Sequence, residues 1–460
     1  MFGSIAIDQG TSRIDGTFGN ATYLAVYALF HIFIAWLLLV KEKSTTWARW
    51  IYGATIAINT IVLYKTATRG DLLGLMGGVL LVAVLIIIFE RRPEMMRVRK
   101  MSAGAILTLL ALVGVFFIAK DTSFVKDSET LNRFATISLT EKTTRSRFQI
   151  WGLAIEGFKE RPILGWGQEN FNIIFGNYYD SRLYDQEPFF DRAHNVFLDW
   201  LTAGGILALL SYLSIFFAVI YYIWRRKESD FTTIEKSILT GMLGAYFFQN
   251  LFVFDNLMSY ILFFSILAYV HNRSTRNNVS KEKNISENTQ YIVISLSVVL
   301  VVLSIYVFNV KGILANRALL QAISPQKEGF QSNLDYFKKA LSYNTIGTAE
   351  TREQLLKITS RIASIKGAPE QIKRDMFDFG RSEMLKQIKK KPDDMRYEFI
   401  LGSFLGRFGV VEESIAHLKR AIELSPNKQS TYFELVNEYI NTKKYDEAFK
   451  TAKTAYELEK

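Results

Sequence analysis

The residues best suited to chemistry lie in the stretch FFDRAHNVFLDW, residues 189–200, where a polar segment meets a long apolar run. This stretch contains His194, one of four histidines in the chain, followed directly by Asn195. His194 is either a reactive group held at a membrane surface or a polar residue at the start of a helix that Asn195 caps. Taken alone, the residues of the stretch favour the helix start.

A second group of candidates precedes it in RSRFQIWGLAIEGFKE, residues 145–160. An apolar face repeats here at helical spacing, so we expect an amphipathic helix that stops at Arg161-Pro162. The residues of that face are Phe148, Trp151, Ile155 and Phe158. Tryptophan suits the boundary between lipid and water, so the helix is expected to lie on the membrane with Arg145 and Arg147 near the headgroups.

The polar segment that holds these residues, 120–195, is far longer than a connection between two helices needs to be. We therefore expect it to have structure and function of its own. Gly165 and Gly167 fall in PILGWGQENF, where no strand precedes them and no Walker lysine follows. They are expected to form a turn and not a phosphate-binding loop.

The elements that position this segment are membrane-spanning helices. The chain of 460 residues is 49% hydrophobic, and a bilayer core requires about 20 apolar residues in a helix. We expect an all-α, polytopic membrane protein with a membrane domain over residues 1–310. About eight spans are expected, at 21–40, 47–64, 72–89, 101–119, 196–224, 238–254, 257–270 and 291–310. The run 238–270 is long for one span and short for two.

The charge of the connecting loops decides whether the run 238–270 crosses the membrane once or twice. The Lys/Arg-rich connections are KEKSTTWAR, RRPEMMRVRK, RRKESD and HNRSTRNNVSKEK. The positive-inside rule places all four in the cytoplasm only if 238–270 crosses twice, turning near 254–256. Segment 120–195 and everything after Val310 then lie outside the cytoplasmic membrane. The net charge of +11 is thus explained by topology, and nucleic acid is not expected as a partner.

Several kinds of chemistry are excluded by composition. The chain has no cysteine, which rules out a thiol nucleophile, disulfides and thiolate metal sites. The four histidines are scattered and form no obvious zinc cluster, so no metal or cofactor is expected. In the expected topology His194 is the one histidine outside the membrane beside an arginine-bearing helix.

Residues 311–460 change to a Lys/Glu-rich pattern with a period of 34 residues. Pro392 and Pro426 are one period apart, as are Leu401 and Leu435. This spacing resembles tetratricopeptide repeats, and LDYFKKALSYN at 334–344 looks like half of an earlier, degenerate unit. Small residues at 402, 414 and 421 would let paired helices pack closely. We expect an α-solenoid that docks or spaces a protein partner.

The order of several motifs resembles the O-antigen ligase and polymerase superfamily of bacterial envelope glycosyltransferases. The matching residues are Arg147, Trp151, Pro162, Gly165, Gly167, His194 and Asn195. RIDGTFGNATYLA at 13–25 and TATRGD at 66–71 resemble two further motifs of the family, with Thr68 in place of a serine. Members usually have more spans before the first of these, so the chain resembles a shortened or fragmentary member. A tetratricopeptide tail occurs in some of them.

The resemblance implies transfer of a glycan from a polyprenyl diphosphate to an acceptor hydroxyl of a glycan, lipid or protein, outside the cytoplasmic (inner) membrane. No cofactor is needed, because the diphosphate is the leaving group. Arginine neutralises such a group by bidentate contacts, which makes Arg147 and Arg69 the first candidates and Arg13 and Arg145 the second. His194 would be the general base, with inversion at the sugar, and Asn195 would orient it or cap its helix. Trp151, Gly165 and Gly167 are supporting residues.

Other functions remain open at this point. Ligase, polymerase and protein O-oligosaccharyltransferase share the pattern. A transporter of a polyprenyl-linked substrate would need charged residues inside spans, and the spans here are nearly free of charge. A non-catalytic anchor that displays a repeat scaffold is the third possibility. For that anchor, His194 and Arg147 would be dispensable.

Overall fold

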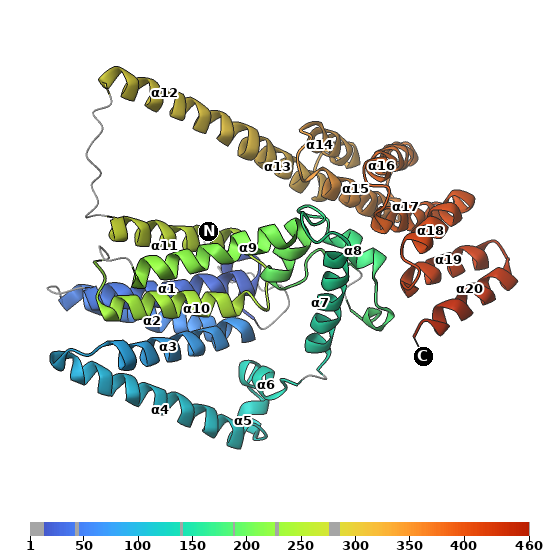
Figure 1. The fold of residues 1–460 in the computed structure, drawn as a ribbon. Helices are drawn as coiled ribbons and strands as arrows, with labels where there is room; N and C mark the ends of the chain where they lie inside the picture. Colours follow the sequence, from blue (N-terminus) through green and yellow to red (C-terminus); the bar gives the residue numbers. More distant parts are fainter. Residues whose placement is uncertain are drawn as a thin grey trace. The chain divides into compact units, whose positions relative to one another are not determined.

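The computed structural model describes residues 13–41, 46–138, 141–186, 189–225, 230–275 and 286–459. Three of the four basic connections considered above fall partly outside these residues. Within them the chain is built of helices and contains no strand, as the sequence predicts (Figure 1). It divides into two compact units. Unit 1 comprises residues 1–171 and 191–281, and unit 2 comprises residues 172–190 and 282–460.

Unit 1 has a helix at each expected span that falls within it. Its long helices are α1 (Ala21–Lys41), α2 (Thr46–Lys65), α3 (Arg69–Phe89), α4 (Met96–Ala119), α9 (Val196–Trp224), α10 (Thr233–Gln249) and α11 (Leu257–Thr275). The ambiguous run 238–270 is interrupted by a turn at 250–256, so it forms two helices, as expected. The loop before α9 forms α5 (Ser123–Lys126), α6 (Glu129–Ala135) and α7 (Lys142–Glu160). Figure 1 shows α7 across one end of the bundle.

Five segments in the described residues are long and apolar enough to cross a bilayer: Ala21–Lys41, Arg69–Phe89, Pro93–Ala119, Val196–Trp224 and Glu287–Ile323. They make the chain a multi-pass membrane protein. The other expected spans, α2, α10 and α11, are helical but are shorter or more polar than that standard.

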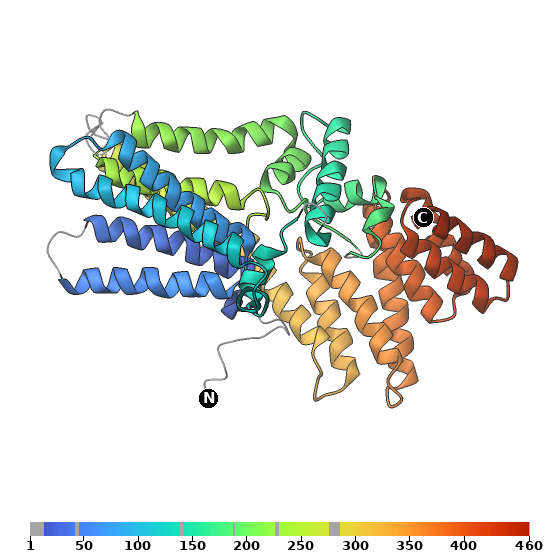
Figure 2. The same ribbon diagram turned by 90° about the horizontal axis from the view of Figure 1, so that it is seen from below.

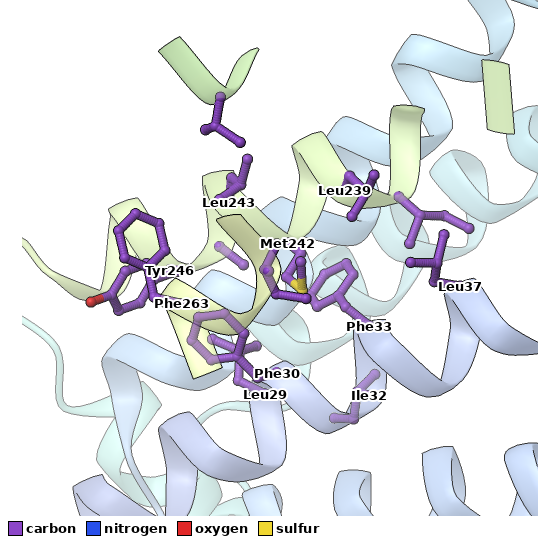
Figure 3. Packing of buried hydrophobic residues seen from close by; sticks show 14 of the residues in the cluster. Leu29, Phe30, Ile32, Phe33, Leu37, Leu239, Met242, Leu243, Tyr246 and Phe263 are labelled. Atoms are coloured by element: carbon purple, nitrogen blue, oxygen red, sulfur yellow. The ribbon is translucent and has the colours of Figure 1, made fainter. Parts of the chain in front are cut away.

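The core of unit 1 forms where α1, α10 and α11 meet (Figure 3). Phe30 and Phe33 of α1 are fully buried against Met242 and Tyr246 of α10. Phe263 of α11 closes the cluster, with its ring 5.1 Å from that of Tyr246. Since lipid is as apolar as these side chains, close packing and not water exclusion holds such helices together.

Small residues let α3 approach α10 closely. A Cβ atom built on Gly78 would lie 2.7 Å from the carbonyl oxygen of Gly241, and one on Gly241 would lie 2.6 Å from that of Gly78. Gly74 faces Ala245 in the same way, one turn along each helix. This small-xxx-small contact fixes the start of α3, which carries Arg69, relative to the turn after α10.

The C-terminal part of unit 2 begins with α12 (Glu287–Ser304), which continues through a π-helical segment, Ile305–Val310, into α13 (Lys311–Ile323). The expected domain boundary at residue 310 therefore falls inside a continuous helix. The remaining helices are α14 (Phe330–Ser342), α15 (Thr348–Ala363), α16 (Glu370–Lys390), α17 (Met395–Arg407), α18 (Val411–Leu424), α19 (Gln429–Asn441) and α20 (Tyr445–Glu457). Figure 2 shows them packed as successive pairs.

The last two pairs follow the sequence period. α17 and α19 begin at Met395 and Gln429, 34 residues apart, and α18 and α20 keep the same offset. The small residues pack as expected: Ser414 donates a hydrogen bond to the carbonyl of Gly402 at 2.8 Å, and a Cβ on Gly402 would lie 2.8 Å from Leu418. Segment 172–190, which contains most of α8 (Phe171–Asn177), also belongs to this unit.

Candidate functional site

A cavity of about 300 Å³ lies in unit 1 at the starts of α1, α3 and α7 and the turn after α10. Four arginines line it, Arg13, Arg69, Arg133 and Arg147, and Asp71 is its one acidic lining residue. The rest of the lining is Thr22, Thr68, Gly70, Leu73, Ile137, Thr143, Thr144, Phe148, Trp151, Phe252 and Val253. The cavity thus combines positive charge with hydroxyl groups and an aromatic wall.

Two of the arginines are held by neighbouring groups. Arg13 donates its Nε–H to the carbonyl of Thr66 at 2.8 Å. Arg69 pairs with Glu141, whose Oε2 lies 2.9 Å from the guanidinium. Both side chains of this pair are about one-fifth exposed. Glu141 also accepts hydrogen bonds from the hydroxyls of Thr143 and Thr144, so one carboxylate links α3 to the start of α7.

The guanidinium groups of Arg133 and Arg147 make no hydrogen bond or ion pair with any residue that the structure describes. The Arg147 guanidinium lies 6.0 Å from the centre of the Phe252 ring. Burial lowers the pKa of Arg147, and the nearby charge of Arg69 lowers it further. The pKa of Arg133 is lowered by burial and by the charges of Arg13 and Arg69. The cavity therefore holds mutually repelling cations, which an anion would stabilise.

Backbone dipoles add to this charge. α3 begins at Arg69 and α7 at Lys142, and the first turn of each contributes residues to the lining. The unpaired N–H groups of a helix N-terminus favour negative charge. Asp71 lies in the same first turn of α3, and its side chain is fully buried.

The backbone around His194 is held by five hydrogen bonds. The Ala193 carbonyl accepts from the indole of Trp151 at 3.1 Å, and the Ala193 N–H donates to Asp199 at 2.7 Å. The Asn195 side chain accepts from two N–H groups of the first turn of α9, which confirms it as the cap. The Val196 N–H donates to the carbonyl of Asn250 at 2.9 Å.

His194 adopts a φ of 54°, in the left-handed region that non-glycine residues rarely occupy. Its ring packs edge-on against Phe254 at 5.3 Å, and its Nδ1 lies 3.3 Å from the carbonyl oxygen of Arg192. His194 is not among the residues that line the cavity. It is connected to the lining through Trp151, which holds Ala193, and through Phe254, which follows Phe252 and Val253 in the chain.

The two glycines expected to form a turn do so. Gly165 and Gly167 have φ values of 65° and 88°. The turn packs on α9 where Gly205 interrupts that helix with a φ of 67°. The Trp166 N–H donates to the Thr202 carbonyl and the Gly167 N–H to the Ala203 carbonyl, both at 2.8 Å.

The structure brings Arg13, Arg69, Arg147 and Trp151 to one cavity and leaves Arg145 exposed outside its lining. Sequence reasoning missed Arg133, although it lies 14 residues before Arg147 in the same polar segment. The expected apolar face of α7 is not the one that packs inside unit 1: Phe148 is 49% exposed, whereas Ile150 and Ala154 are buried. Phe148 and Trp151 of the expected face line the cavity instead.

The fold and the site define a multi-pass helical membrane protein with an arginine-lined cavity beside a constrained histidine. The family model described as O-antigen ligase matches residues 54–213. The match covers about a third of the chain and includes Arg69, Arg147 and His194, but not Arg13 or the helix pairs of unit 2. It supports a membrane glycan-transfer function of the O-antigen ligase kind. No curated protein matches the chain.

Proposed function

We propose that this chain transfers a glycan from a polyprenyl diphosphate carrier to an acceptor hydroxyl at the outer face of the cytoplasmic membrane. The observation that carries the proposal is the convergence of four arginines on one cavity. A diphosphate needs several positive charges, and arginine supplies them with paired N–H donors. The aromatic wall of the cavity suits the adjoining lipid and sugar.

In the proposed reaction the acceptor oxygen bonds to the anomeric carbon while the bond from that carbon to the diphosphate oxygen breaks. Attack opposite the leaving group inverts the configuration at the sugar. Arg147, Arg69, Arg13 and Arg133 stabilise the charge that leaves with the diphosphate. Arg69 would exchange its contact with Glu141 for one with the phosphate.

His194 would accept the proton of the acceptor hydroxyl. The Arg192 carbonyl beside Nδ1 favours the tautomer that carries its proton there, and in that tautomer the lone pair is on Nε2. The hydrogen bonds to Ala193, the Asn195 cap and the contact of Val196 with Asn250 maintain the φ of His194 against its strain. Such strain is typical of functional positions and supports a catalytic role.

The number of membrane crossings and the repeat type of the helix pairs are part of the same proposal. We assign eight crossings, with α2, α10 and α11 as the additional spans, so that the α5–α7 loop and the helix pairs lie outside the cytoplasm. We assign the pairs from α13 to α20 to a tetratricopeptide-type solenoid, supported by the 34-residue offset of the last two pairs.

The test uses the full chain in lipid nanodiscs with a polyprenyl diphosphate-linked oligosaccharide, and it measures released polyprenyl diphosphate and glycosylated acceptor. Arg147→Ala should lower turnover about a hundredfold or more, and His194→Ala should do the same. Arg97→Ala, which removes an exposed arginine outside the cavity, is the matched control. Unchanged turnover in both of the first two variants would overturn the mechanism.

A further inference from the structure

Segment 172–190 of the loop between α7 and α9 is docked on the helix pairs of unit 2. The Asn172 amide donates a hydrogen bond to Asp394, which precedes α17. Further along, Asn427 donates to the carbonyl of Tyr179 at 3.4 Å, and Gln429 donates to that of Ser181 at 3.2 Å. The segment thus runs over the N-terminal ends of α17 and α19.

The centre of this contact is a buried lysine. The Lys428 side chain is 2% exposed, and its Nζ lies 4.4 Å from the ring centre of Tyr179, 4.7 Å from Phe189 and 5.3 Å from Phe175. All three rings belong to the docked segment. A desolvated ammonium group surrounded by aromatic faces is a strong and directional contact. On the neighbouring pair, Arg396 lies 5.3 Å from the Phe189 ring.

Lys428 is an unfavourable choice for the helix that it begins. It occupies the N-cap of α19, where Asp, Asn, Ser or Thr would satisfy free N–H groups and where the helix dipole opposes a cation. One period earlier the same position is Asp394, which does cap α17. Both N-caps contact the docked segment. Lys428 therefore stabilises the contact with the docked segment, although it destabilises the start of α19.

The docked segment is short, and both of its ends lead to the candidate site. Asn172 follows the Gly165–Gly167 turn by five residues, and Phe190 precedes His194 by four. The turn and the residues around His194 are each fixed by hydrogen bonds to α9 or to the loop beside it. Holding 172–190 therefore restricts the chain that follows the Gly165–Gly167 turn and the chain that leads directly to His194.

We propose that the helix pairs of unit 2 are the receptor for segment 172–190 of the same chain, and that Lys428 is a positioning residue for His194. This rests on the proposed function, because His194 is taken as the base of the transfer reaction. The occupant of this face is the chain's own loop, and a foreign partner would have to displace it.

A disulfide tests the docking directly, because the chain contains no cysteine of its own. A Cβ built on Gly176 lies 3.9 Å from the Cβ of Met395, within the roughly 3.5–4.5 Å that a disulfide requires. The full-length double variant Gly176→Cys/Met395→Cys should form an intrachain bond under mild oxidation, detected by mass spectrometry after thiol alkylation. A folded protein that forms no such bond would refute the docking.

Lys428→Glu tests the positioning. We expect kcat to fall about tenfold or more while the donor KM changes less than about twofold, and Lys428→Arg should retain most of the activity. Oxidation of Lys428→Glu in the Gly176→Cys/Met395→Cys background should restore kcat. Lys444→Glu is the matched control, since Lys444 occupies the N-cap of α20, is exposed, and its side chain has no hydrogen bond or ion pair with the described residues of the segment.

Wild-type kcat in Lys428→Glu, or no recovery on oxidation, would overturn the positioning role. If the unsubstituted chain transfers no glycan, the proposed function fails, whereas the disulfide still decides whether the segment is held by unit 2. The two failures are therefore distinguishable.

Discussion

Trp151 donates its indole N–H to the backbone carbonyl of Ala193 across 3.1 Å, so one side chain both lines the arginine cavity and holds the residue before His194. Trp151→Phe keeps the ring and removes the N–H. Because Ala193 is fully buried, its carbonyl would lose its partner at a cost of about 1–3 kcal/mol. We expect kcat to fall roughly tenfold with donor KM little changed. Trp50→Phe, at a 77% exposed position, is the control, and an unchanged kcat in Trp151→Phe would show that the bond does not matter for transfer.

Glu141 limits the positive charge of the cavity by pairing with Arg69. Glu141→Gln removes that charge and leaves Arg69 available to an anion. We expect the dissociation constant of geranylgeranyl diphosphate, measured by calorimetry in detergent, to fall about threefold or more, with a steeper dependence on salt. Glu156→Gln, on the exposed part of α7, should leave it unchanged. Weaker binding in Glu141→Gln would indicate that the pair organises the site.

His194 combines a side chain proposed for catalysis with a strained backbone. Glycine adopts a φ of 54° without penalty, so His194→Gly should be more stable than His194→Ala by about 1 kcal/mol, while both lose transfer activity. Thermal unfolding of the two variants in the same detergent gives the comparison. A glycine variant no more stable than the alanine variant would show that the left-handed backbone at residue 194 stores little strain.

Adjacent glycines on α3 differ in what surrounds them. A Cβ on Gly78 would meet the backbone of Gly241, whereas a Cβ on Gly77 meets nothing within 4 Å. Gly78→Ala should therefore separate α3 from α10 and destabilise unit 1 by about 1–3 kcal/mol, and Gly77→Ala should be neutral. Thermal unfolding followed by tryptophan fluorescence reports on this unit, because all seven tryptophans fall within it. Equal stability of the two variants would contradict the close crossing.

Burial lowers the pKa of Lys428 from 10.5 to about 8. Between these values the unfolded chain binds a proton that the folded chain lacks, so stability is lowest below pH 8 and rises with pH through that window. Relative to Lys428→Met, the free energy of unfolding should increase by about 1.5 kcal/mol between pH 8 and 9.5. Urea unfolding of the full chain followed by far-UV circular dichroism measures it. Parallel pH curves would show that the aromatic rings keep the ammonium form, with its pKa near 10.5.

The helices were predictable because each follows from a local pattern. Apolar runs marked the spans, the 34-residue period marked the last helix pairs, and Asn195 before an apolar run marked the start of α9. The residues around Gly165 and Gly167 likewise predicted that these glycines form a turn. In each case the determining residues lie within one or two turns of each other.

The site was only partly predictable, because it depends on contacts between distant residues. Three different helices carry Arg69, Arg133 and Arg147, and Arg13 precedes the first helix, so no spacing links Arg133 to the others. The docking of Tyr179 beside Lys428 joins positions about 250 residues apart. Lys428 itself looked like an ordinary charged residue in a Lys-rich tail, and only its burial reveals its role.

The interruption of α9 at Gly205 bears on how deep each part of this helix lies in the bilayer. It divides α9 into 196–204, fixed to the Gly165–Gly167 turn and the loop, and 206–224, which runs on uninterrupted. The second part has 19 residues and is about 29 Å long, close to the thickness of the hydrocarbon core. In the proposed topology 206–224 crosses the membrane, so Gly205 would lie at its surface and His194 would stand among the headgroups, at the level of the proposed lipid diphosphate.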